Sequence, residues 1–212
     1  MNQLQEQEPK TFTDLLRKIF KNILYGIAEF LNRLGVRPNV ITAFGLIGNL
    51  AAGILIATGH LFWGGLTALI VGPLDALDGV LARLRNESSE YGAFVDSITD
   101  RYSEMAIFGG LLVYFSKTGN WLDSLLIFSA AIGSFMVSYT RARAESLGYS
   151  AKIGLLTRAE RYLILVPGVV LGYPRISLWI IAVLANFTAL QRFIHVRKKT
   201  REITNQKIQK KE

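Results

Sequence analysis

Four of the six aspartates in this chain lie within 26 consecutive positions: Asp75, Asp78, Asp96 and Asp100. On helices, the first two are at i and i+3 and the last two at i and i+4, so each pair shares one helix face. Four carboxylates that face one hollow cannot all stay ionised without cations. Because hard divalent ions such as Mg²⁺ take oxygen ligands, the spacing predicts a divalent metal site.

Small residues accompany these aspartates. Gly79 and Ala82 continue the stripe of the first pair, and Gly92 lies one turn before Asp96. Such residues leave a hollow and let backbone come close to a ligand. The two histidines lie far away in sequence, which argues against zinc, and a chain without cysteine has no thiolate site.

The elements that must position the aspartates are membrane helices. Half of the residues are hydrophobic, and they come in long runs, as spans of about 20 residues require. We expect an all-α integral membrane protein with six transmembrane helices preceded by an amphipathic interfacial helix. The spans are expected at residues 39–58, 61–83, 92–116, 121–142, 155–172 and 176–196.

The depth of the aspartates follows from the lengths of the second and third spans. Residues 61–74 precede Asp75 and cover about 21 Å of helix, which is short of a hydrocarbon core of about 30 Å. The second helix must therefore continue through Asp78, and by the same argument the third must begin before Asp96. Since the two helices run antiparallel, all four aspartates are expected at one end, slightly below the membrane surface.

Charge assigns that end to the cytoplasm. With both termini on one side, that side holds 22 of the 24 lysines and arginines, which puts the termini and the aspartates in the cytoplasm. Residues 1–37 are expected to hold the interfacial helix, residues 38–197 the six-span domain, and residues 198–212 a basic tail. An apolar stripe from Phe12 to Leu34 predicts that helix, with a soluble helix packed on the rest as the alternative.

Two other interpretations of the aspartates are open. They could pair with Arg83, Arg85 and Arg101 and only hold helices together. They could also form the cation path of a transporter, although their clustering at one end and the absence of an inverted repeat argue against that.

The pattern Asp75-x2-Asp78-Gly79-x2-Ala82-Arg83-x8-Gly92-x3-Asp96-x3-Asp100 resembles the signature of the CDP-alcohol phosphotransferase family. The resemblance implies a six-span membrane enzyme that passes the phosphatidyl group of CDP-diacylglycerol to an acceptor hydroxyl and releases CMP. It also implies a homodimer, no nucleic-acid partner, and two Mg²⁺ ions per site, with Mn²⁺ as the alternative metal.

Roles for individual residues follow from the same resemblance. The four aspartates would be the metal ligands, and Asp100 would also be the base that takes the acceptor's proton. The residues implied around the CDP-lipid are Pro38, Asn39, Val40, Ile41, Gly79, Ala82, Arg83 and Ser89.

A second charged cluster bears on the acceptor. Arginine matches phosphate oxygens in bidentate geometry, so a phosphorylated acceptor is expected near Arg141, Arg143, Arg161 and Arg192. This region resembles that of phosphatidylinositol phosphate synthases, which implies inositol 1-phosphate, with glycerol 3-phosphate as the alternative. A purely structural alternative pairs the arginines with Glu145 and Glu160 or has them orient the protein in the membrane.

Overall fold

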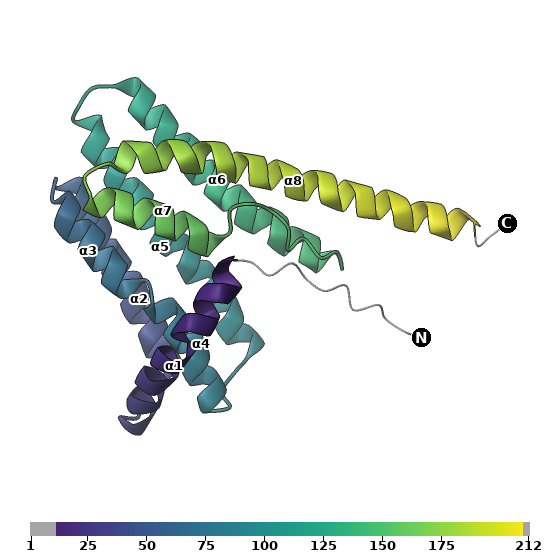
Figure 1. The fold of residues 1–212 in the computed structure, drawn as a ribbon, viewed down its shortest axis with the longest axis horizontal. Coiled ribbons are helices and arrows are strands. Elements are labelled where there is room, and N and C mark those ends of the chain that lie inside the picture. The colour runs from purple at the N-terminus through teal and green to yellow at the C-terminus, as the bar shows by residue number, and fades with distance from the viewer. Residues whose placement is uncertain (1–11, 210–212) are drawn as a thin grey trace.

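The computed structural model describes residues 12–209, with side chains from residue 22 onward except 203, 204 and 206–208. Within that range every regular element is a helix, as expected (Figure 1). The helices are α1 (Phe12–Arg33), α2 (Pro38–Ala57), α3 (Leu61–Val71), α4 (Leu74–Leu84), α5 (Glu90–Ser116), α6 (Trp121–Ser146), α7 (Arg158–Val170) and α8 (Pro174–Gln209).

The helix ends follow local sequence signals. Each of the three short turns after α2, α5 and α7 contains a glycine with positive φ, namely Gly59, Gly119 and Gly172. Glycine adopts this left-handed conformation without a steric penalty, so each helix can stop sharply there. These turns gather at the left in Figure 1, away from the α4–α5 and α6–α7 connections. The turns predicted at these places are confirmed.

The predicted second span is broken into two helices. Gly72 and Pro73 separate α3 from α4, where the sequence suggested one continuous helix. Gly72 and Pro73 both keep right-handed helical dihedral angles, but proline has no N–H to donate, so it interrupts the hydrogen-bond ladder. Helix α4 restarts at once, because the amides of Ala76 and Leu77 donate to the Pro73 carbonyl. The aspartates of this segment therefore lie in the first turns of α4, while residues 61–84 together still form one segment long enough to span, as predicted for residues 61–83.

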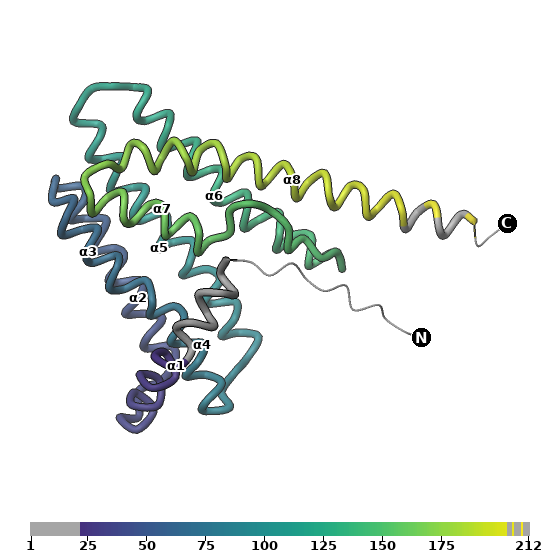
Figure 2. Tube along the Cα trace, in the orientation of Figure 1, coloured from purple at the N-terminus to yellow at the C-terminus, as the bar shows by residue number. Residues whose placement is uncertain are grey.

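Helix α5 is held closely against α2, and this sets the position of its aspartates (Figure 2). A Cβ added at Gly110 would lie 2.3 Å from the Gly53 carbonyl oxygen, and one at Gly53 would lie 2.4 Å from that of Ala106. The two backbones are therefore nearly in contact. Elsewhere α3 packs on α7, and α6 and α7 both pack on α8, around a core of aliphatic side chains and phenylalanine.

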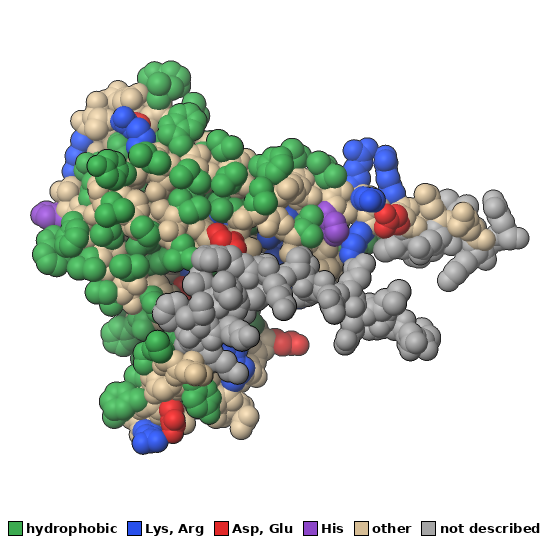
Figure 3. All heavy atoms as spheres, in the orientation of Figure 1, with side chains coloured by type: hydrophobic (Ala, Val, Ile, Leu, Met, Phe, Trp, Pro, Cys, Tyr) green, Lys and Arg blue, Asp and Glu red, His purple; other side chains and the backbone are tan. Residues whose placement is uncertain are grey.

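The chain is an integral membrane protein by the length and apolarity of its helices. Within residues 12–209, four segments are long and apolar enough to cross a bilayer: Pro38–Ala57, Leu61–Leu84, Trp121–Ser146 and Pro174–Glu202. Large apolar side chains such as Phe44, Ile54 and Trp179 are exposed, and hydrophobic groups cover much of the face in Figure 3. Such a surface suits lipid better than water.

Two of the six predicted spans do not meet that standard. Helix α7 has 13 residues, or about 20 Å of helix. Helix α5 has 27 residues, but its first half carries Asp96, Asp100, Arg101 and Glu104. Helix α1 packs on α4, where Ala28 joins Leu77 and Leu81. The side chains of the stripe before residue 22 lie outside the described part, so its interfacial placement stays a prediction.

Candidate active site

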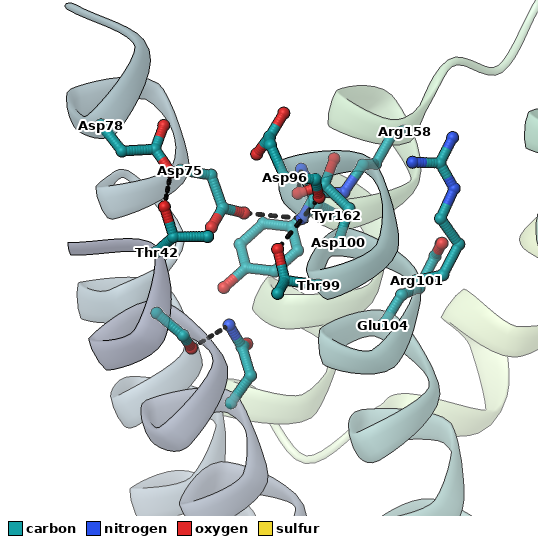
Figure 4. Close-up of polar contacts among 12 residues, drawn as sticks. Thr42, Asp75, Asp78, Asp96, Thr99, Asp100, Arg101, Glu104, Arg158 and Tyr162 are labelled. Atoms are coloured by element: carbon teal, nitrogen blue, oxygen red, sulfur yellow. Dashed lines mark hydrogen bonds and ion pairs between the residues drawn. The ribbon is translucent and has the colours of Figure 1, made fainter. Parts of the chain in front are cut away.

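The four aspartates come together from the first two turns of α4 and the first half of α5. Figure 4 shows Asp75 and Asp78 on α4 facing Asp96 and Asp100 on α5 across a common space. The 85–89 connection reverses the chain, and the Ser89 hydroxyl accepts a hydrogen bond from the Gly92 amide at 3.0 Å to start α5. The spacing argument for two pairs on facing helices is therefore consistent with the structure.

Asp78 is held by a residue that sequence reasoning missed. The hydroxyl of Thr42 on α2 donates to Asp78 Oδ2 at 2.6 Å, and both side chains are buried. Thr42 is also 3.3 Å from the Pro38 carbonyl, which ties it to the start of its own helix. The only signal in the sequence is a hydroxyl one turn after Pro38, in a helix whose other polar side chains are Asn39 and Asn49.

Arg158, the first residue of α7, joins the two helices that carry the aspartates. Its Nη2 donates to Asp75 Oδ2 at 2.6 Å, and its Nη1 lies 2.7 Å from Asp100 Oδ1. The second contact is an ion pair without good hydrogen-bond geometry, so the buried Asp100 Oδ1 has no hydrogen-bond donor. None of Arg83, Arg85 and Arg101 forms an ion pair with these aspartates. Arg85 pairs with Glu87, and Arg101 donates to the Ser97 carbonyl.

The floor of this space is formed by Tyr162, one turn after Arg158. Its hydroxyl donates to the Ala68 carbonyl at the end of α3, and its ring lies against Gly72. A Cβ at Gly72 would come within 2.5 Å of that ring. The Gly72 position between α3 and α4 therefore admits an aromatic ring, which packs α7 against the end of α3.

The donor set fits a hard divalent cation. The site offers only oxygen ligands, and its four carboxylates have one guanidinium among them as a direct partner. Among the described side chains, however, no three acidic or histidine groups already surround a single point. The Asp100 oxygen that lacks a hydrogen-bond donor lies against the Arg158 guanidinium, so a cation would have to replace that contact to bind this atom. The assignment of the four aspartates as metal ligands stays a prediction with suitable chemistry.

The residues expected around the CDP-lipid differ in their surroundings. Gly79 is open, since an added Cβ would have only Arg83 Nη1 within 4 Å, at 3.7 Å, and Arg83 and Asn39 are exposed. Ala82 is half-buried, and Val40 is exposed. Ile41, in contrast, is buried with Leu77 and Leu81. Ile41 therefore packs the start of α2 against α4, and Ser89 is a helix cap.

The four arginines expected at the acceptor are not equivalent. Arg161 is 1% exposed, and its Nε and Nη2 donate to the two Glu104 oxygens at 2.7 and 2.8 Å. Arg192 is also buried and donates to the carbonyls of Ile153 and Val137. Arg141 pairs with Glu145 at 2.9 Å near the end of α6, and Arg143 is exposed.

Arg161 therefore has a different partner from those considered in the structural alternative. That alternative named Glu145 and Glu160, but the carboxylate that binds Arg161 is Glu104 on α5. Glu160 instead forms a capping box with Thr157 at the start of α7. Arg161 keeps one unsatisfied group, since its Nη1 is buried and has no hydrogen-bond partner. Arg192 lies in the field of both kinds of charge, with Arg141 and Arg161 opposing its cation and Glu145 and Glu160 favouring it.

Comparison with known proteins extends these observations. The sequence model described as CDP-alcohol phosphatidyltransferase matches residues 35–191. A phosphatidylinositol phosphate synthase of Streptomyces avermitilis is 37% identical over 203 residues, covering 88% of this chain and 82% of that protein. An archaetidylinositol phosphate synthase of Pyrococcus horikoshii is 32% identical over 185 residues, covering 87% of this chain and 96% of that one.

Solved structures show the same similarity in fold. The phosphatidylinositol phosphate synthase of Mycobacterium tuberculosis with CDP-DAG bound has a TM-score of 0.76 and 29% identity, covering 82% of this chain and 94% of that one. The same synthase has also been solved in complex with manganese and citrate, again with a TM-score of 0.76 and 29% identity, covering 82% of this chain and 88% of that one.

Proposed function

Because this chain belongs to the CDP-alcohol phosphatidyltransferase family, we propose that it transfers the phosphatidyl group of CDP-diacylglycerol to inositol 1-phosphate. The products are phosphatidylinositol phosphate and CMP. The observation that carries the proposal is the meeting of Asp75, Asp78, Asp96 and Asp100 on α4 and α5 inside the family match. Relatives named for inositol phosphate acceptors support the choice of acceptor.

In this reaction the acceptor's hydroxyl oxygen bonds to the phosphorus of the phosphatidyl group. The bond from that phosphorus to the bridging oxygen breaks, and CMP leaves with the electron pair. Asp100 takes the hydroxyl proton on its carboxylate, which must lie free of Arg158 to act as a base. Asp75, Asp78, Asp96 and Asp100 would hold two Mg²⁺ ions, or Mn²⁺ instead. The ions supply positive charge that neutralises the pyrophosphate oxygens.

The nature of the acceptor rests on the buried arginines. In the described part of the chain, Arg192 has carbonyl partners and no carboxylate within ion-pair distance. Arg161 has Glu104 as its anion, but its buried Nη1 has no hydrogen-bond partner. A buried charge without an anion is costly, so an acceptor phosphate beside Arg141, Arg161 and Arg192 would stabilise this cluster. Arg143 is exposed, and its place in the site rests on sequence alone.

The membrane arrangement belongs to the same proposal. Six spans with α1 in the cytoplasmic interface would place both termini, the basic residues 198–212 and the aspartates at the cytoplasmic surface. The lipid tails of the substrate would stay in the bilayer, while its CDP group reaches Gly79, Ala82 and Arg83. The working unit is proposed to be a homodimer.

An acceptor panel tests the proposal. The purified protein is given CDP-diacylglycerol, Mg²⁺ and, in separate reactions, inositol 1-phosphate, glycerol 3-phosphate, inositol or serine, and CMP release is followed. We expect release with inositol 1-phosphate. Release with glycerol 3-phosphate alone would make the enzyme a phosphatidylglycerophosphate synthase. Release with inositol or serine would show that the acceptor needs no phosphate and would contradict the proposed phosphate site.

A further inference from the structure

Two ion pairs connect α5 to α7, one turn apart. Asp100 and Glu104 are four residues apart on α5, and Arg158 and Arg161 are three apart on α7, so the pairs lie one above the other. The Glu104–Arg161 pair is buried and bidentate. Arg158 is 31% exposed and divides its two contacts between Asp100 and Asp75. The Glu104–Arg161 pair therefore has the geometry of a permanent structural contact. The contacts of Arg158 have the geometry of contacts that can be exchanged.

Arg158 can leave without undocking α7. Glu104 and Arg161 hold the next turn of the helix, and the Tyr162 hydroxyl fixes it to Ala68 on α3. The Thr157 capping box keeps the first turn helical whatever the Arg158 side chain does. The guanidinium, in contrast, lies on a long flexible side chain at the more open end of the site.

Arg158 also occupies the carboxylates that a cation would need. Asp75 and Asp100 belong to the predicted ligand set, and the arginine lies 2.6 and 2.7 Å from one oxygen of each. A divalent ion would bind the same oxygens and would repel the guanidinium at that distance. The two positive groups therefore compete for one pair of carboxylates.

We propose that Arg158 is an internal counter-ion of the aspartate cluster, which holds Asp75 and Asp100 together while the metal is absent and is displaced when the metal binds. It keeps α4, α5 and α7 assembled in the metal-free protein, where four carboxylates would otherwise repel one another. The same contacts weaken cation binding, because they must break first. This inference rests on the proposed metal site.

The test is Mn²⁺ binding, measured by electron paramagnetic resonance on the full-length protein in nanodiscs, for wild type and Arg158→Gln. We expect Arg158→Gln to bind Mn²⁺ about 10-fold more tightly or better, because a charge-assisted contact no longer has to break. In EDTA the variant should melt at a lower temperature than wild type, and saturating Mn²⁺ should close most of that gap.

Arg101→Gln is the matched control. It removes the same charge beside Asp100, but the Arg101 side chain donates to the Ser97 carbonyl and pairs with none of the aspartates. Arg101→Gln should raise Mn²⁺ affinity much less. Equal gains in the two variants, or no gain in Arg158→Gln, would overturn the counter-ion role while leaving the metal site intact. Failure of the wild-type protein to bind Mn²⁺ would instead overturn the metal site itself.

Discussion

At the scale of single residues, Asp78 is the most enclosed of the four aspartates and has Thr42 as a dedicated partner. Asp78→Asn removes a negative ligand and keeps the shape, so the protein should fold. Loss of a group that only supports a metal ligand typically costs about 10- to 100-fold in affinity or activity, so loss of the ligand should cost at least about 100-fold. CMP release by a variant with an unchanged size-exclusion profile measures this.

Thr42→Val provides the graded comparison for that experiment. It keeps the shape and removes the hydroxyl that orients Asp78 at 2.6 Å. A loss of about 10- to 100-fold is expected, smaller than that of Asp78→Asn. Near wild-type turnover in Asp78→Asn would show that this carboxylate is not a ligand.

Asp100 is expected to act on the acceptor's proton more than on substrate binding. Loss of a positioned base typically lowers the rate by about 10²–10⁴. Asp100→Asn should therefore lose turnover and keep much of the affinity for CDP-diacylglycerol, measured by equilibrium binding of the lipid. An equal collapse of rate and affinity would make Asp100 chiefly a metal ligand.

The variant Arg192→Ala tests whether this arginine binds the acceptor. If it binds the acceptor's phosphate, Arg192→Ala should raise the acceptor KM by roughly 10- to 100-fold, because a charged hydrogen bond is worth about 1.5–3 kcal/mol. The KM for the CDP-lipid should change little. Arg197→Ala, an exposed arginine on the same helix, is the control and should change neither value. An unchanged acceptor KM in Arg192→Ala would leave the arginine with a purely structural role.

At the scale of elements, the contact between α2 and α5 should decide whether Asp96 and Asp100 reach the site. A Cβ at Gly110 would meet the Gly53 backbone at 2.3 Å, whereas one at Gly109 has nothing within 4 Å. Gly110→Ala must push the helices apart, and overpacking of this kind typically costs about 1–3 kcal/mol.

Gly109→Ala is the neighbouring control and should be neutral or slightly stabilising, since alanine favours helix over glycine by about 1 kcal/mol. Thermal unfolding and CMP release are measured for both variants. Equal stability of the two would mean that α2 and α5 are not held as closely as their backbones indicate.

At the scale of the whole molecule, the sequence predicted the helical class, the turns and the family, and these are confirmed. Helical spacing and the length of a bilayer-crossing helix are general, so they could place four aspartates at one end of two helices. They could not identify Thr42 or Arg158 as partners of the aspartates. Those contacts join residues on different helices that lie 36 and 83 positions apart in sequence. The Glu104–Arg161 pair likewise joins two helices, α5 and α7, through residues 57 positions apart in sequence.

The interruption of the predicted second span has a local cause that the sequence did contain. Pro73 precedes Asp75 by two residues, and a proline inside a span is tolerated when neighbouring groups compensate for the lost hydrogen bond. Hydropathy alone does not reveal the break between α3 and α4, because residues 61–84 together are apolar enough to form one continuous span. The short α7 and the charged first half of α5 likewise reflect the site that these helices build.

The most direct test of the central claim is product analysis by mass spectrometry. Liposomes that contain the purified protein and CDP-diacylglycerol are supplied with inositol 1-phosphate and Mg²⁺. We predict phosphatidylinositol phosphate and CMP in equal amounts, with neither formed in EDTA or by Asp100→Asn. Absence of both products from a folded wild-type protein, or CMP released without a new phospholipid, would contradict the assignment of this protein as a phosphatidyl transferase.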